Sequence, residues 1–385
     1  MINDHHDMIQ AVIDIVKSTQ AYLPMGNHPS LQKSWWSENE FILTDHLNEA
    51  SSTYKQKTQA ERALSLIADA YAQFLNRATN PAWSALTVEQ RKAKVQRLKD
   101  LPQIAQRSRE WYLNFAKVLT ASEFSSLFGS PRQRRTLALT KAKPKIDENT
   151  TFRTACPTDE MSPVGWGIRF EPVVKQILEY TFNCKIFEPG RITHPDKPHL
   201  AASADGIFEE SEDPKQLGRL VEIECPYTRA IGGEIPIDYW IQMQIQMEVT
   251  DIDECEYCEV EILSRRSLKP APDLSGMSLQ GTLYLIKQVV ADGQPFDYKY
   301  LYGDIGSNVV PPIPEGYEVI ETIPWGFKKW HHKIVQRDRT WYAATEAWQD
   351  AFWADVEAAR KGEELTFGMA TEPMPAPTLC LIQDD

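Results

Sequence analysis

Two short stretches near the middle of the chain decide its fold: A-S-A-D-G-I-F at 202–208 and G-R-L-V-E-I-E-C-P at 218–226. In the first, Asp205 precedes a glycine at the expected end of a strand. In the second, side chains alternate between the two faces of a strand, so Glu222 and Glu224 share one face. Carboxylates at a turn and on the adjacent strand can converge on a divalent cation, and such oxygen ligands favour Mg²⁺ or Mn²⁺.

Helices are expected on both sides of these strands. Glu171 follows W-G-I-R-F and falls in the first turns of an amphipathic helix that begins after a proline. A second expected helix, Tyr239–Val249, contains three glutamines. Gln242 and Gln246 share one face of it, whereas Gln244 points about 200° away. Only one of these two faces can meet the carboxylates.

The order of elements predicts an α/β protein with helical additions at both ends. We expect residues 1–105 to be a helical N-terminal region, 106–300 a mixed core, and 301–385 a helical, Trp-rich extension with an irregular tail. The predicted strands are Lys185–Glu188, Leu200–Phe208, Arg219–Cys225, Cys255–Leu263 and Thr282–Val290. The predicted helices include 60–77, 164–182 and 326–361.

Charge is distributed unevenly along the 385 residues. The net charge of −13 argues against a nucleic-acid partner. However, residues 201–264 hold 16 acids and 3 bases, so this one segment has a net charge equal to that of the whole chain. A basic segment at 131–145 contains no acid. A phosphate-binding strip beside a carboxylate metal site would have this pattern, although two solvated surfaces of opposite charge would share it. The basic residues of the segment are Arg132, Arg134, Arg135, Lys141, Lys143 and Lys145.

Targeting signals are not evident in the sequence. The chain has no apolar run of transmembrane length, and its first residues lack the features of a secretory signal. Its 6 cysteines are irregularly spaced, which favours a reducing compartment over a disulfide scaffold. We therefore expect a protein of the cytoplasm, or of the nucleus or viral replication compartment of a host cell, that is not secreted and has no membrane partner.

Several blocks of sequence, in the same order, resemble the lambda-exonuclease / YqaJ viral recombinase family of the PD-(D/E)XK nuclease superfamily. They are W-Y-L-N-F-A-K-V-L-T-A-S-E-F (111–124), G-x-x-x-E (167–171), S-x-D-G (203–206), E-x-x-C-P (222–226) and Y-x-x-Q-x-Q-x-x-M-x-V-T (239–250). I-P-W (323–325) and V-Q-R-D-R-T-W (335–341) resemble the C-terminal region of versions encoded by large DNA viruses. The resemblance covers residues 106–360.

This resemblance implies a restriction-endonuclease-like core, a central mixed sheet flanked by helices. It also implies hydrolysis of DNA phosphodiesters with one or two Mg²⁺ or Mn²⁺ ions. The usual activity of the family is 5′→3′ digestion of duplex ends, which leaves 3′ single strands for a strand-annealing protein. Ring-shaped trimers and monomers both occur among the relatives, so an oligomer is possible.

The resemblance also assigns roles to individual residues. Asp205 and Glu222 would bind the metal, with the Ile223 carbonyl as a further ligand and Glu171 completing the shell directly or through water. Gln242 would orient the attacking water or a phosphate oxygen. Contacts to backbone phosphates would come from Ser122 and the basic segment 131–145.

The sequence departs from the family at the position of its motif lysine. Glu224 stands there, which makes the site more acidic, although some restriction endonucleases of the superfamily carry glutamate at this position and still cleave. Lys175, one turn after Glu171, is an alternative source of the positive charge, or simply an i, i+4 partner of Glu171. Lys117 stands near the place of an arginine that contacts a terminal 5′ phosphate in relatives, which weakens the expectation of a 5′-phosphate preference.

Three functions fit these observations. The first is a metal-dependent deoxyribonuclease, an exonuclease on duplex ends. The second is a nuclease fold that has lost catalysis and binds DNA or a recombination partner, which Glu224 motivates. The third is a nuclease acting on RNA or on structured or nicked DNA.

Overall fold

The structure, a computed structural model, describes most of residues 81–366. Outside the description lie 1–80, 107, 144–161, 233, 266–271, 276, 278, 292–293, 295, 308 and 367–385. The helix predicted at 60–77, the irregular tail and Lys145 therefore lie outside the described residues.

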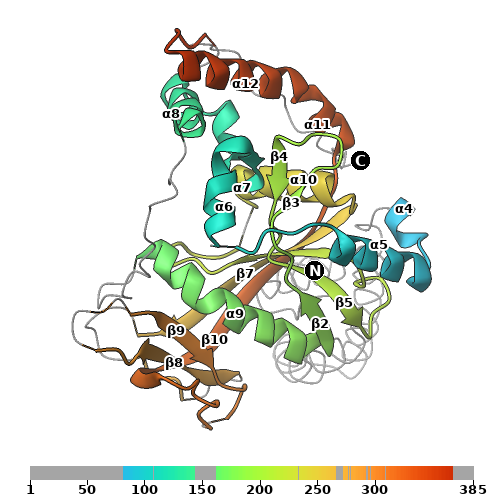
Figure 1. Ribbon diagram of the computed structural model, residues 1–385. Helices are drawn as coiled ribbons and strands as arrows, with labels where there is room; N and C mark the ends of the chain where they lie inside the picture. The colour runs from blue at the N-terminus through green and yellow to red at the C-terminus, as the bar shows by residue number, and fades with distance from the viewer. Residues whose placement is uncertain are drawn as a thin grey trace, which may run out of the picture.

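A seven-stranded mixed sheet forms the centre of the described chain (Figure 1). Its only parallel pair among the described strands is β6 with β7, and the remaining pairs are antiparallel. The mixed α/β class predicted from the sequence is confirmed. In spatial order the strands are β2 (Cys184–Phe187), β5 (Gly206–Ser211), β6 (Leu220–Glu224), β7 (Glu254–Ser264), β10 (Tyr317–Gln336), β8 (Gln280–Gln288) and β9 (Tyr298–Tyr302).

A small three-stranded sheet and several helices surround this centre. The small sheet has the order β1 (Leu119–Thr120), β4 (Leu200–Ala202) and β3 (Ile192–Thr193). The α-helices are α4 (Pro81–Ser84), α5 (Val88–Asp100), α6 (Arg109–Asn114), α7 (Ala121–Phe124), α8 (Pro131–Ala142), α9 (Pro163–Phe182), α10 (Ile237–Thr250), α11 (Arg339–Ala344) and α12 (Glu346–Lys361), with 3₁₀ turns at Phe115–Lys117 and Ser125–Phe128.

Helices α9 and α10 cover opposite faces of the sheet. Along β6, Leu220 packs into the hydrophobic cluster that includes α10 residues such as Met243 and Ile245. Val221 and Ile223 instead join the cluster that contains the buried face of α9. This is the period-2 alternation of a strand, and it directs Glu222 and Glu224 toward the α10 side.

The predicted helix at 326–361 is wrong over its first part. Residues 326–336 belong to β10, a 20-residue strand that pairs with β7 on one side and with β8 on the other. A register shift between Phe327 and Lys329 interrupts its alternation, and Pro324 and Gly326 lie within it. Proline, glycine and a bulge all obscure a strand pattern, which explains the error. Helices α11 and α12 follow.

The predicted strand Leu200–Phe208 is two strands. Its first residues form β4 of the small sheet, and those from Gly206 onward form β5 of the large one. The chain turns at 203–205 between them. The break places Asp205 between the two sheets, at the start of β5.

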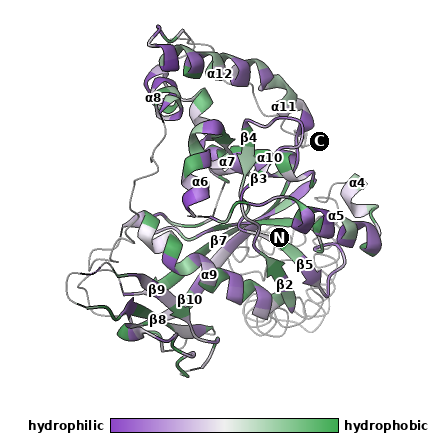
Figure 2. Ribbon diagram, in the orientation of Figure 1, coloured by the Kyte–Doolittle hydropathy of each residue, from purple (hydrophilic) through white to green (hydrophobic). Residues whose placement is uncertain are grey.

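Helix α12, the last helix of the described residues, packs against α8 (Figure 1). It carries both hydrophobic and hydrophilic residues (Figure 2). Its buried side includes Trp348, Phe352 and Val356, which join the cluster on the α10 side of the sheet. The Trp-rich segment thus supplies core side chains. Within the described residues, no helix is both long and apolar enough to cross a membrane.

Candidate functional site

Asp205 is held against the open edge of β6. Its Oδ2 accepts a hydrogen bond of 2.7 Å from the Ile223 N–H. This contact is available because β5 pairs with β6 only as far as Val221. The N–H and C=O of one strand residue point to the same side, so the Ile223 carbonyl lies on this edge too.

The glycine after Asp205 is required by packing. A Cβ atom on Gly206 would lie 2.2 Å from Ile186 Cγ2 and 2.9 Å from Val221 Cγ1. Only glycine lets β5 fit between its two neighbouring strands at this point. The S-x-D-G motif thus fixes the place at which Asp205 meets β6.

Glu222 is buried and is held by two amides from α10. Gln242 Nε2 donates to Glu222 Oε1, and Gln246 Nε2 donates to Glu222 Oε2 at 2.7 Å. Of the two glutamine faces considered from the sequence, this is the one that meets the carboxylates. Gln244, on the other face, donates to the Gln336 carbonyl and accepts from the Asp338 N–H.

A pocket of about 190 Å³ lies on the α9 side of this edge. Glu171, Asp205 and Ile223 line it, so the structure brings three of the predicted metal-shell residues to one cavity. Lys175 and Glu188 also face it. Glu222 and Glu224 belong to the other face of β6 and do not line this pocket.

The carboxylates are nevertheless close enough to influence one another. Burial, and then the charges of Glu222 and Glu171, raise the pKa of Asp205 well above its usual value. Burial and the charge of Glu224 do the same for the pKa of Glu222, against the opposing effect of the glutamine amides. Burial raises the pKa of Glu224 to about 7, although a hydrogen bond with Tyr239 and the charge of Arg229 oppose the shift.

This donor set fits a hard divalent cation in its chemistry. Buried carboxylates repel one another unless they take up protons or a cation. Gln246 Oε1 is also buried without a hydrogen-bond partner in the described part of the chain, as an acceptor that faces a bound water would be. Across the described residues, however, no three His, Cys, Asp or Glu side chains stand close enough together to hold a metal ion.

The predicted DNA contacts divide into exposed and buried side chains. Lys141 is fully buried, and its Nζ donates to the Phe115 carbonyl and, at 2.6 Å, to Glu123. Arg134 is 3% exposed and donates to the Gly129 carbonyl. Neither side chain reaches solvent, so both brace the segment that carries the T-A-S block. The exposed residues are Ser122, Lys117, Arg132, Arg135 and Lys143.

Sequence reasoning missed two neighbours of Glu224. Tyr239 hydrogen-bonds to Glu224, and Arg229 forms an ion pair with Glu259, which is opposite Glu224 in the β6–β7 register. Tyr239 precedes Gln242 by three residues, and this spacing could have identified it. Arg229 lies in an irregular segment that offers no periodic signal.

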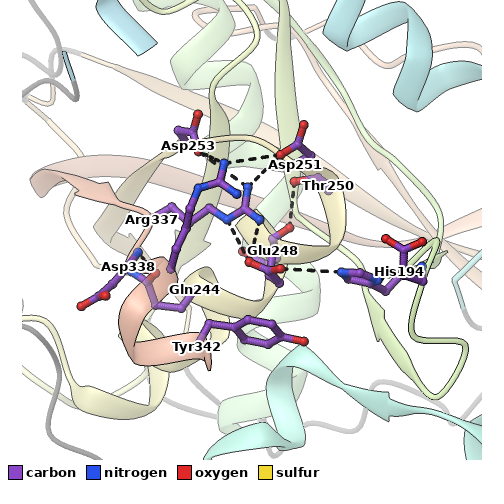
Figure 3. A network of polar contacts seen from close by, with 12 residues as sticks. His194, Gln244, Glu248, Thr250, Asp251, Asp253, Arg337, Asp338 and Tyr342 are labelled. Carbon is purple, nitrogen blue, oxygen red and sulfur yellow. Dashed lines mark hydrogen bonds and ion pairs between the residues drawn. The ribbon is translucent and has the colours of Figure 1, made fainter. Parts of the chain in front are cut away.

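A second group of carboxylates lies at the C-terminal end of α10 and just after it (Figure 3). Arg337, whose side chain is 4% exposed, donates to Glu248 at 2.6 Å and to Asp251 at 2.9 Å. His194 Nε2 lies 3.7 Å from the other oxygen of Glu248. Asp253 lies 3.6 Å from Arg337. This Arg337 network ties α10 to the end of β10 and to the loop before β4.

Comparison with known proteins gives one family-model match and several partial similarities. Residues 110–253 match the model of the YqaJ-like viral recombinase domain. An uncharacterized protein of Acanthamoeba polyphaga mimivirus is 27% identical over 176 residues, which are 43% of this chain and only 31% of that relative. The chain is also similar to the crystal structure of an alkaline exonuclease from Laribacter hongkongensis, with a TM-score of 0.39, 17% identity and coverage of 66% of this chain and 95% of that one. A phage-related exonuclease from Haemophilus somnus has a TM-score of 0.31 and 15% identity, with 63% and 92% covered.

Proposed function

Because the chain carries a YqaJ-like viral recombinase domain over residues 110–253, we propose that it is a metal-dependent deoxyribonuclease. Its substrate is the end of a DNA duplex, which it digests 5′→3′ to leave a 3′ single strand for recombination or replication. The observation that supports the proposal is the pair of buried carboxylates of Asp205 and Glu222, whose pKa values are raised by burial and by the charges of neighbouring carboxylates.

Each residue of this group has a role in the proposal. Asp205, Glu222, the Ile223 carbonyl and Glu171 hold one or two Mg²⁺ or Mn²⁺ ions. Such an ion lowers the pKa of bound water and neutralises charge on the phosphate. Gln242, together with Gln246, fixes the carboxylate of Glu222 by hydrogen bonds. These amides are positioning groups that act through Glu222.

Glu224 makes the site depend more strongly on the cation than a lysine would. Its carboxyl group, with a pKa of about 7, is partly protonated near neutral pH and hydrogen-bonds to Tyr239. When it ionises it adds to the negative charge that DNA must approach. We therefore propose that DNA enters only after the cation has bound.

In this proposal, the exposed basic residues bind the phosphate backbone of the DNA whose end enters the pocket. Arg132, Arg135 and Lys143 on or just after α8 are exposed, as are Lys117 and Ser122 near α7. Contacts of this kind bind the phosphate backbone without reading sequence. In this proposal the partners are duplex DNA ends and a single-strand annealing protein.

The decisive experiment compares the parent protein with Asp205→Asn on end-labelled linear duplex in Mg²⁺ or Mn²⁺. We expect the parent to release nucleotides from the ends and the variant to release none. Circular, nicked and RNA substrates, and 5′-phosphate against 5′-hydroxyl ends, define the substrate class. Equal digestion by parent and variant would show that the assigned site is wrong.

A second function, binding DNA ends without cleavage, is favoured by one specific observation. Both oxygens of Glu222 accept hydrogen bonds from glutamine amides, and the described residues contain no ready-made group of three metal-binding side chains. Glu224→Lys separates the two functions. Activity gained by an inactive parent supports a degenerate site, whereas activity lost from an active parent supports a site adapted to glutamate.

A further inference from the structure

One basic side chain faces the same pocket as Glu171 and Asp205. Lys175 lies one turn after Glu171 on α9, so both point to the same side of the helix. The side chain of Lys175 is 23% exposed. A lysine in this position buries its aliphatic stem and presents its ammonium group to the cavity.

The ion pair that Lys175 makes is a loose one. Its Nζ lies 3.6 Å from Glu188 Oε2, longer than a direct hydrogen bond, and the side chain of Glu188 is 54% exposed. Helical spacing suggested Glu171 as the partner of Lys175, and the ion pair that the structure gives for Lys175 is with Glu188. Exposed pairs of this kind contribute little to stability, so the ammonium group remains able to turn to another anion.

We infer that Lys175 binds a phosphate group of the DNA strand in this pocket. On β6, Glu224 occupies the position at which the resembling family has its motif lysine. Lys175 on α9 supplies a positive charge to the pocket instead. A phosphate entering a cavity lined by carboxylates meets repulsion, and an ammonium group at the cavity wall offers three donors and an opposite charge. The inference rests on the proposed function.

DNA binding gives the first test, in chains that carry Asp205→Asn so that the probe is not digested, and with Mg²⁺ present because the cation is proposed to bind before DNA. The anisotropy of a labelled blunt duplex is followed over a series of salt concentrations for Lys175→Gln, Lys175→Arg and the control Lys185→Gln, an exposed lysine of β2 outside the pocket. We expect Lys175→Gln to reduce the slope of log affinity against log salt by about 0.9, the loss of one phosphate contact. Lys175→Arg and Lys185→Gln should keep the slope.

A purely structural lysine would behave differently. In that case Lys175→Gln would bind DNA with unchanged affinity and slope, and the inference would be overturned. Glu188→Gln adds an independent arm, because it removes a negative charge from the pocket and also releases the ammonium group, so it should tighten DNA binding more when Lys175 is present than when it is absent. Tightening of equal size in a Lys175→Gln chain would also overturn the inference.

Digestion separates this inference from the function on which it rests. With Asp205 intact, we expect Lys175→Gln to slow digestion by about 10- to 100-fold and Lys175→Arg to recover most of the rate. If Lys175→Gln digests as fast as the parent while Asp205→Asn is inactive, the inference fails and the proposed function stands. If neither the parent nor Asp205→Asn digests duplex DNA, the proposed function fails, and the salt series still tests whether Lys175 contacts a phosphate.

Discussion

Two groups of carboxylates near helix α10 differ in their partners and in the direction in which their pKa values are shifted. In one group, Glu222 receives only neutral amides, and its pKa is raised by burial and by Glu224. In the other, burial of Asp251 is outweighed by hydrogen bonds and charges from Arg337 and Lys94, which hold its pKa at about 2 (Figure 3). Among the described residues, Asp251 pairs with cationic side chains, whereas the carboxylate of Glu222 accepts hydrogen bonds from neutral amides.

The same contrast recurs within the sheet. Arg219 donates to Glu254 at 2.7 Å and also pairs with Glu256, and all three side chains are buried. Burial would raise the pKa of Glu256, but Arg219 and His332 lower it to about 2. Arginine thus pairs with the buried acids Glu254 and Glu256, and among the described residues no arginine pairs with Asp205 or Glu222. We take this difference to mark a site for an external cation.

The largest effect is expected from neutralising a site carboxylate. Glu222→Gln should lower metal-dependent digestion at least about 1,000-fold, the scale at which one member of a catalytic unit is missed. The protein should stay folded, because the substitution removes a buried charge that has no cationic partner in the described part of the chain. Digestion of linear duplex and urea unfolding of the same sample measure both quantities. A destabilised Glu222→Gln protein would contradict the comparison.

Removing the arginine of the Arg337 network should reduce the stability of the fold. Arg337→Met removes the buried arginine that pairs with Glu248, whereas Asp251 and Asp253 keep Arg339, and losing one partner of a buried pair costs at most about 3–5 kcal/mol. Arg339→Met is the matched control, because its side chain is 59% exposed and pairs with the same aspartates. The control should cost less than about 1 kcal/mol. Equal losses in the two variants would remove the distinction between the groups.

The two groups should also respond to pH with opposite sign. Glu224 has a raised pKa of about 7 against the ordinary 4.5, so the stability it contributes is present below the ordinary value and is lost as pH rises through 7. Asp251 has a pKa lowered from 3.8 to about 2, so its contribution is present above the ordinary value and is lost as pH falls through 2.

Urea unfolding in the presence of a metal chelator measures the free energy of unfolding across both pH ranges. Glu224→Gln should flatten the loss of stability between about pH 5 and pH 8, and Asp251→Asn should flatten the loss in acid. Mg²⁺ should restore stability on the neutral side in the parent. If Glu224→Gln loses as much stability as the parent between about pH 5 and pH 8, another group is responsible for that loss.

The smallest effects are expected at the surface of α8. Arg132→Gln and Arg135→Gln should each weaken DNA binding roughly threefold and reduce the salt slope by about 0.9. Thr136→Ala, an exposed neutral change on the same helix, is the control. Anisotropy with a duplex probe measures all three. An unchanged slope in both arginine variants would move the DNA path away from α8.

The sequence predicted those features that depend on local periodicity. The alternation of β6 fixed the face of Glu222, and the helical spacing of Gln242 and Gln246 predicted a shared face that the structure directs at it. Asp205 could be placed because a glycine that tolerates no Cβ follows it. In each case the direction of a side chain follows from its own element.

Features that depend on distant partners could not be predicted. Lys141 reads as a phosphate-binding residue in a basic segment, yet its ammonium group is satisfied by Phe115 and Glu123, which belong to other elements. In β10, a bulge and the residues Pro324 and Gly326 hide the strand, whose pairing with β7 and β8 decides its conformation. Long-range pairing overrides local pattern in both examples.

Binding of Mn²⁺ tests the central claim most directly. Titration of the metal into the parent, into a double variant with Asp205→Asn and Glu222→Gln, and into Asp251→Asn compares the two groups of carboxylates in one measurement. We expect the parent and Asp251→Asn to bind one or two ions with the same affinity and the double variant to lose that binding. Binding by the double variant equal to that of the parent would contradict the assignment of Asp205 and Glu222 to a cation site.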